Sequence, residues 1–448
     1  MNTQNTKRNW FKNSLSIKML TVGVLTLILL IPLNLVEDLI HERKYRQQDV
    51  VNEINQKWGS EVTLYGPIFK IPYSHYVTQR VFSEETKTYF EQEEESIRYA
   101  FVFPDQLDVQ AEVESKPLKR GNYESVVFSS EFKISGQFTP VDLSDQDIEQ
   151  KNIHWDKVKV LFKTSNLKGI KTAVEVNLDG KPRPLSATFN HQNSDGLKLL
   201  ESKPFEIKPD DTLSFDFNLD CNGSRFVKLI PVGKETNMQM SSTWKDPSFD
   251  GNFLPNVETK QISEDGFSAD WTILHINRAF SQQHLGSVPN LQNYAFGARF
   301  VVPANEYQQS ERSVKYGFLV IALTFGIFLL IQLINKIYIH PFQYLMIGLA
   351  LTLFYTLLVS ISEHSSFSLA YIISCFATIL MISLYSKSIL KSAKFSLFIG
   401  SALSILYSFL FVIIQLKFYS LLVGSVGLFV ILALIMYVSR KIDWEQRA

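Results

Sequence analysis

Three residues flank one apolar segment and have side chains that could do acid–base or metal chemistry. His340 precedes residues 342–361, and Glu363 and His364 follow them. A carboxylate beside an imidazole can exchange protons or bind a metal ion. Neighbours at a helix end need not face one site, however, and charges at a membrane interface can simply remain in water. We therefore treat Glu363, His364 and His340 as weak functional candidates, and we predict no catalytic, cofactor-binding or metal-binding residue.

The other chemical signals in the sequence point away from catalysis. There is no Walker loop, no Gly-x-Ser-x-Gly elbow and no paired-cysteine metal site. His41-Glu42-Arg43-Lys44-Tyr45 has tyrosine where the zinc-protease pattern requires a second histidine, so a solvated helix face is the better interpretation. The carboxylates between Glu91 and Glu95 are typical of a solvated loop. These features predict a protein that is not an enzyme.

Long apolar windows predict a membrane protein. A bilayer core about 30 Å thick requires about 20 apolar helical residues to cross it. Six windows meet this requirement: residues 19–36, 314–334, 342–361, 367–385, 395–415 and 418–438. The first could instead be a cleaved signal peptide, but no small-x-small site follows it, which favours an uncleaved anchor. The spans contain no ionisable side chain in their interiors, which argues against a transporter or ion pump.

Lysine and arginine set the expected orientation, because short cytoplasmic loops are enriched in them. If the spans alternate, one side of the membrane collects Lys7, Arg8, Lys12, Lys18, Lys336, Lys387, Lys391, Lys394, Arg440, Lys441 and Arg447. The short loops of the opposite side contain only Lys417. Both termini are therefore expected in the cytoplasm of a bacterial cell, in a multi-pass inner-membrane protein. The 44 basic and 44 acidic side chains balance, which gives no reason to expect a nucleic-acid partner.

The segment between the first two spans has the period-two pattern of β-strands. Leu213, Phe215, Phe217 and Leu219 alternate with polar residues, which predicts one buried and one wet face. Asp-Gly pairs such as Asp179-Gly180 predict two-residue hairpins, and we interpret Asn222-Gly223 as a turn rather than a glycosylation site. Most aromatic side chains fall on inward positions, which favours a core over a ligand platform. We predict antiparallel sheets packed as a sandwich.

These patterns give a domain organisation of one span, a β-rich domain and five further spans. The expected parts are a basic cytoplasmic N-terminus (1–18), the first span (19–36), a periplasmic stalk helix (37–65), a periplasmic β-rich domain (66–313), a five-helix bundle (314–438) and a cytoplasmic tail (439–448). Small residues recur at helical spacing in three spans, which predicts close helix packing, with a lipid groove as the alternative. These stripes are Gly348, Thr352, Thr356 and Ser360; Ala370, Ser374 and Thr378; and Gly400, Ser404 and Ser408.

Several short segments form a combination that is more specific than any one of them. In order along the chain, they are Gly66-Pro67-Ile68-Phe69-Lys70-Ile71-Pro72, Trp244, Pro247-Ser248-Phe249, Gly251-Asn252-Phe253-Leu254-Pro255, Lys315-Tyr316, Ile321-Ala322-Leu323-Thr324-Phe325, His340-Pro341-Phe342-Gln343-Tyr344-Leu345, Ser362-Glu363-His364 and Ile442-Asp443-Trp444. Together they resemble the CreD family of inner-membrane cell-envelope integrity proteins. The resemblance implies a role in envelope maintenance and no established reaction.

The leading hypothesis is a non-enzymatic protein that serves envelope integrity or the envelope stress response through its periplasmic β domain. Its expected partners are the lipid bilayer and periplasmic or membrane proteins of unknown identity. The alternative is a membrane-embedded enzyme or lipid handler that uses the outer interface near Glu363 and His364.

Overall fold

The computed structural model describes residues 15–82, 88–146, 148–188, 195–300, 306–416 and 419–440. The basic residues expected at positions 7, 8, 12, 417, 441 and 447 therefore lie outside the described residues. The chain forms two compact units. One, the helical unit, comprises residues 1–49 and 304–448, and the other, the β domain, comprises residues 50–303.

The β domain is built on sixteen described strands. They are β1 (Val62–Phe82), β2 (Tyr89–Val102), β3 (Gln106–Arg120), β4 (Tyr123–Phe138), β5 (Lys159–Thr164), β6 (Glu175–Leu178), β7 (Lys181–Thr188), β8 (Lys198–Ser202), β9 (Leu213–Ser224), β10 (Phe226–Leu229), β11 (Glu235–Ser242), β12 (Pro247–Gly251), β13 (Gln261–Ser263), β14 (Gly266–Leu274), β15 (Gln283–Leu285) and β16 (Phe296–Phe300). Their order is β12-β16-β10-β1-β5-β8-β7-β6-β9-β4-β3-β11-β14-β13, with β2 beside β1 and β15 beside β2.

The sheet is mixed rather than purely antiparallel as the alternation had suggested. β1 runs parallel to β10, and β3 runs parallel to β11, while the other pairs among the described strands are antiparallel. Each parallel pair joins strands more than a hundred residues apart, such as Val109 beside Met238. Residue alternation reports which face of a strand is buried but not which strand lies next to it.

The sheet encloses one hydrophobic core, so the expected sandwich-like arrangement is confirmed. Phe215, Phe217 and Leu219 are buried along β9, as their alternation predicted. The Phe69 ring of β1 stacks on Phe138 of β4 with centroids 3.7 Å apart. Rings from strands on different stretches of the sheet therefore meet face to face, as in a packed two-layer core.

Two local predictions were wrong. Asn222 and Gly223 lie inside β9 rather than in a turn. A Cβ atom at Gly223 would lie 2.4 Å from the Phe128 ring, so glycine serves close packing in the strand instead of chain reversal. The acidic run lies in β2 rather than in a loop, although its carboxylates are exposed as expected. By contrast, Asp179 and Gly180 form the predicted hairpin turn between β6 and β7, both with positive φ.

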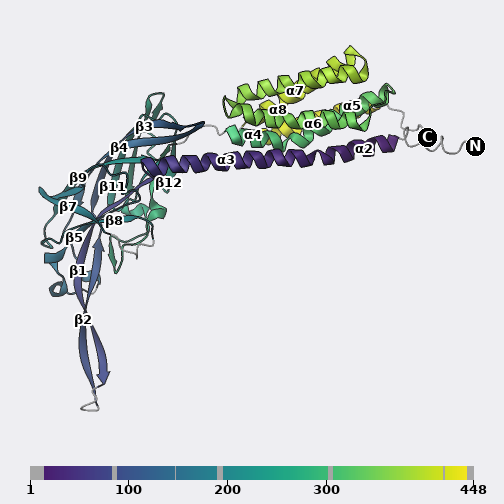
Figure 1. Ribbon diagram of the computed structural model, residues 1–448. Helices are drawn as coiled ribbons and strands as arrows, with labels where there is room; N and C mark the ends of the chain where they lie inside the picture. The colour runs from purple at the N-terminus through teal and green to yellow at the C-terminus, as the bar shows by residue number, and fades with distance from the viewer. Residues whose placement is uncertain are drawn as a thin grey trace, which may run out of the picture. The chain divides into compact units, whose positions relative to one another are not determined.

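β1 and β2 form a long two-stranded arm (Figure 1). They pair from Phe69 beside Val102 to Phe82 beside Tyr89. The neighbouring strand β5 pairs with β1 only as far as Lys70, and β15 pairs with β2 only from Ala100 onward. We call residues 74–82 and 89–97 the arm. Within the described residues, no further strand therefore pairs with either edge of the arm beyond the main sheet.

The helical unit contains the apolar helices expected from the sequence. Its described helices are α2 (Leu15–Ile28), α3 (Leu30–Trp58, whose last residues belong to the β domain), α4 (Glu306–Lys315), α5 (Gly317–Ile334), α6 (Pro341–Ser362), α7 (Phe367–Leu390), α8 (Ala393–Gln415) and α9 (Ser420–Ser439). Six helical stretches are long and apolar enough to cross a membrane, one before the β domain and five after it. This confirms the predicted arrangement of one span, a sheet domain and five spans.

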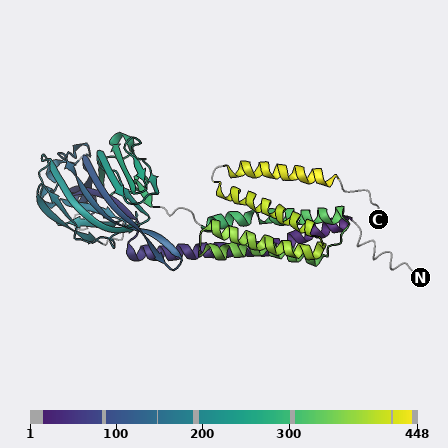
Figure 2. The same cartoon turned by 90° about the horizontal axis from the view of Figure 1, so that it is seen from above.

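Small residues explain much of the helix packing, but not all of it. Gly348 on α6 lies against Leu29, and an added Cβ would be 2.0 Å from that side chain. The stripe Ala370, Ser374 and Thr378 on α7 is buried as predicted. The stripe on α8 does not fit the prediction, because Ser404 and Ser408 are exposed. α9 packs beside α8, and none of its described residues is buried (Figure 2).

Candidate functional site

The Glu363 carboxylate lies in a cluster of charged side chains rather than beside a catalytic partner. Glu363 follows the last turn of α6, where its Oε1 is 3.6 Å from Nε of Arg43 on α3. The Tyr307 hydroxyl of α4 donates to the same oxygen at 3.2 Å. A carboxylate at a helix C-terminus is opposed by the helix dipole, and the guanidinium offsets that repulsion. The main contacts of Glu363 are therefore those of an ion pair that joins three helices.

A second carboxylate, Glu311 on α4, completes this cluster. Its oxygens lie 3.2 Å from Nζ of Lys44, 3.1 Å from Nζ of Lys315 and 3.8 Å from Nε2 of His41. His41 and Lys44 are three residues apart, so they share one face of α3. The hydrogen bonds from Lys315 and then Lys44 lower the pKa of Glu311, although partial burial opposes them. We call Arg43, Lys44, Tyr307, Glu311 and Glu363 the α4 charge cluster.

α4 also closes the end of α8. The Arg312 guanidinium donates to the carbonyl oxygens of Ile413 and Leu416 at 3.1 and 3.0 Å. These carbonyls belong to the last turn of α8, where no helical N–H remains to bond them and where a positive charge is favourable. α4 thus fastens the ends of α6 and α8 to the part of α3 that bears Arg43 and Lys44.

His340 lies at the other end of α6 and is not part of this cluster. Its Nδ1 accepts a hydrogen bond from the Phe342 N–H at 3.2 Å, and its own N–H donates to Oε1 of Gln343 at 2.9 Å. This reciprocal pair caps the start of the helix. At about 1.5 Å of rise per residue, α6 separates His340 from Glu363 by more than 30 Å. The structure therefore does not bring the three sequence candidates into one site.

Sequence reasoning missed Arg43, Lys44, Tyr307 and Glu311. They come from segments more than 250 residues apart, and each looks like an ordinary solvated charge or phenol in its own segment. The available signal was the pattern of charges. Arg43 and Lys44 on α3 are basic and Glu311 on α4 is acidic, but pairing them requires knowledge of which helices pack together.

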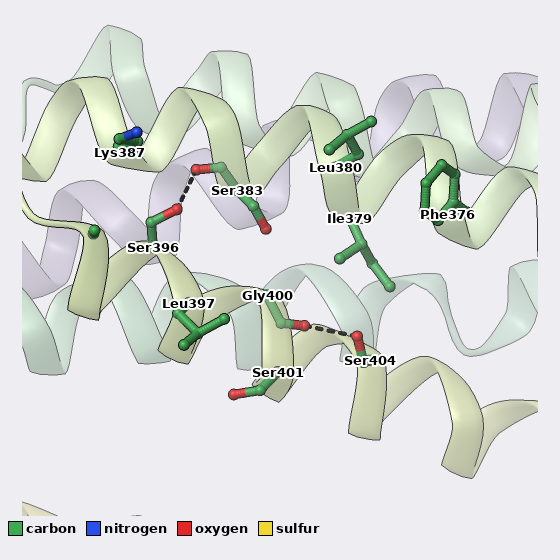
Figure 3. A pocket seen from close by; sticks show the side chains of 11 residues that line it. Phe376, Ile379, Leu380, Ser383, Lys387, Ser396, Leu397, Gly400, Ser401 and Ser404 are labelled. Carbon is green, nitrogen blue, oxygen red and sulfur yellow. Dashed lines mark hydrogen bonds between the residues drawn. The ribbon is translucent and has the colours of Figure 1, made fainter.

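A groove of about 620 Å³ runs between α7 and α8 (Figure 3). Its walls are apolar at Phe376, Leu380 and Leu397, and Lys387 lies at one end. Ser396 donates to the Ser383 carbonyl at 2.5 Å, and this bond joins the two helices. Gly400 lets the two helices approach closely, because a Cβ there would lie 2.7 Å from Oγ of Ser383.

The described residues contain no group of three or more His, Cys, Asp or Glu side chains that could hold a metal ion. Cys221 and Cys375 are both buried and unbonded to each other. Burial raises the pKa of the Cys221 thiol to about 12, so it stays protonated and unreactive at neutral pH.

Comparison with known proteins gives one consistent result. The sequence matches the family described as inner membrane protein CreD over residues 14–445. The inner membrane protein CreD of Escherichia coli (strain K12) is 30% identical over 436 residues, which cover 97% of this chain and 94% of that protein. Among solved structures, an M1 zinc metallopeptidase from Deinococcus radiodurans aligns with 38% of each chain at 10% identity and a TM-score of 0.19, too low to carry an argument. The chain belongs to the CreD family of inner membrane proteins.

Proposed function

We propose that this protein serves envelope integrity or the envelope stress response as a non-enzymatic inner-membrane protein, and that its β domain works on the periplasmic side. In this proposal, the arm of β1 and β2 contacts a periplasmic or membrane protein with a basic surface. The observation that carries the proposal is the arm, because it extends past the main sheet with large apolar side chains in solvent. The family name supports a location in the inner membrane but says nothing about the role of the protein.

The distribution of charge in the helical unit supports a periplasmic β domain. Lys387 and Lys391 lie at the end of α7, and Lys394 lies at the start of α8. Arg312, by contrast, binds the last turn of α8. The length of α8, about 1.5 Å for each of its 23 residues, separates these two ends. Lysine-rich ends face the cytoplasm in most inner-membrane proteins, so α4 belongs at the outer face and both termini belong inside.

The composition of the arm supports a basic protein partner. Tyr76, Tyr89 and Ile97 are about half exposed or more, which is unusual for a group of large apolar side chains on one short hairpin. The carboxylates of Glu91, Glu93, Glu94 and Glu95 are exposed on the same strand. Apolar anchors surrounded by one sign of charge fit a partner surface of the opposite sign.

Site-specific photo-crosslinking in living cells tests this contact. A benzophenone amino acid replaces Tyr76 or Ile97 in the arm, and Ile262 on β13 serves as an equally exposed control. We expect both arm positions to give the same discrete protein adduct, and the control position to give none. Replacing Glu91, Glu93 and Glu95 by glutamine should weaken that adduct. Adducts of equal yield at all three positions, or none from the arm, would contradict the proposal.

The contacts of Glu363 support a non-enzymatic role for the outer interface. General acids and bases contribute factors of about 100 to 10,000 in rate, so an enzyme would not tolerate their loss. We expect Glu363→Gln and His364→Gln each to restore most of the envelope phenotype of a deletion strain when membrane levels are matched. An amide at position 363 still accepts the Tyr307 hydroxyl. Complete loss of complementation in both variants would favour a membrane-embedded enzyme.

A further inference from the structure

We propose that the groove between α7 and α8 binds an anionic glycerophospholipid, with one acyl chain in the groove and the phosphate beside Lys387. This site differs from the proposed partner surface of the β domain and does not depend on it. Three features of the groove favour such a lipid: its apolar lining, a buried hydroxyl in its floor and the positive charge at one end.

The lining of the groove changes along its length from apolar to positively charged, which matches the acyl chain and the phosphate of an anionic lipid. Phe376, Leu380, Ser383 and Lys387 follow at spacings of three or four residues, so they lie along one face of α7. Each helical turn rises about 5.4 Å, so a phosphate at Lys387 places the acyl carbons beside Leu380 and Phe376. Leu397 forms the facing wall from α8 and is 77% exposed. The apolar wall is thus open where a chain would enter.

The floor of the groove contains a hydroxyl that lacks a hydrogen-bond partner. Oγ of Ser383 is buried and accepts or donates no hydrogen bond among the described residues. Such a group is costly in hydrocarbon, where no water can satisfy it. It lies one turn from Lys387, at the level where the ester carbonyl of a lipid follows its phosphate. An ester carbonyl would supply the missing acceptor.

The lysine end of the groove fits an anionic headgroup. Lys387, Lys391 and Lys394 are all exposed at this end. The sequence contains no aspartate or glutamate from His364 to Ile442, so no residue of this stretch balances the charge of the three lysines. A phosphate with net negative charge would provide it, whereas a zwitterionic headgroup would also bring a cation close to the lysines.

Native mass spectrometry of the full chain in detergent tests the proposal. Dioleoyl phosphatidylglycerol and dioleoyl phosphatidylcholine, which share their acyl chains, are titrated separately. One lysine near a lipid surface corresponds to about fivefold in affinity, so we expect the first phosphatidylglycerol to bind about fivefold more tightly. Lys387→Gln should abolish this preference. Lys336→Gln, which removes an exposed lysine in the α5–α6 connection, should leave it unchanged.

A second variant tests the groove itself. Ser401 is an exposed residue of the groove lining, and Ser401→Phe should fill the groove without entering the core. It should weaken binding of both lipids while the chain stays folded. Equal binding of the two lipids to the parent protein would overturn the proposal. So would equal effects of Lys387→Gln and Lys336→Gln, or a dimer in which a second copy fills the groove.

Discussion

A buried ion pair in the β domain gives a quantitative test of how its fold is held together. Lys163 on β5 contacts Asp195 through Nζ and Oδ2, and the two side chains are only 3% and 4% exposed. Asp195 also accepts the Leu197 N–H at 3.1 Å through Oδ1, and the Tyr65 ring lies 5.6 Å from Nζ of Lys163. The pair therefore joins β1, β5 and the segment at Asp195 inside the core.

Lys163→Met keeps the volume of the side chain but leaves the Asp195 carboxylate buried without its cation. Breaking a buried pair in this way costs about 3–5 kcal/mol. For a domain of this size, each kcal/mol lowers Tm by about 2–4 °C, so we expect a decrease of about 6–20 °C. Thermal unfolding of the purified full chain, followed by tryptophan fluorescence, measures it, because Trp271 is buried in this domain.

Two further variants decide whether the cost comes from the unpaired charge. Lys163→Met combined with Asp195→Asn removes both charges and should recover part of the lost stability. Lys245→Met breaks an exposed pair with Glu264, whose side chains are 58% and 91% exposed, and should change stability by less than about 0.5 kcal/mol. The exposed control should leave the Tm within about 2 °C of the parent. The same result for Lys163→Met would refute the reasoning, because about 2 °C is the smallest shift expected for each kcal/mol of lost stability.

Two other predictions concern the same domain. Phe217→Asp places a carboxylate where a 3% exposed ring meets Phe162, so it should cost several kcal/mol and make the β domain sensitive to protease; unchanged resistance would contradict the core assignment. Hydrogen bonds from Lys228 and then Arg299 lower the pKa of Asp250 to about 2. Because this value lies below the ordinary 3.8, the stabilisation is present above about pH 4 and is lost toward pH 2. The Tm of the parent should therefore decrease more over that window than the Tm of Asp250→Asn, and parallel curves would contradict this.

The sequence predicted those features that depend on whether a side chain faces water, lipid or the protein core. It did not predict features that depend on which distant segments pack together. The bilayer demands long apolar helices, so hydropathy alone located six spans, and alternation alone identified the buried face of β9. Strand partners depend on contacts between distant segments, so the parallel pairing of β3 with β11 had no local signal. Gly223 was misassigned for a related reason. A glycine needed for a turn and a glycine needed beside the Phe128 ring look the same in one sequence.

The candidate sites followed the same rule. Glu363 was found because it is a charge at the end of an apolar window, but its partners Arg43 and Tyr307 come from two other helices. The α8 stripe was interpreted as a packing face because Gly400, Ser404 and Ser408 have helical spacing. Spacing alone could not distinguish a packed face from the open groove that Gly400 and Ser404 line.

The central claim is that the β domain works outside the cytoplasm while the lysine-rich helix ends face inside. Labelling of single added cysteines by a membrane-impermeant maleimide in spheroplasts tests it most directly. The native Cys221 and Cys375 are buried, so their background should be low. Lys181→Cys, beside the β6–β7 turn, should label in intact spheroplasts, and Ser392→Cys, between α7 and α8, should label only after permeabilisation. Labelling of Ser392→Cys in intact spheroplasts, with Lys181→Cys protected, would contradict the account.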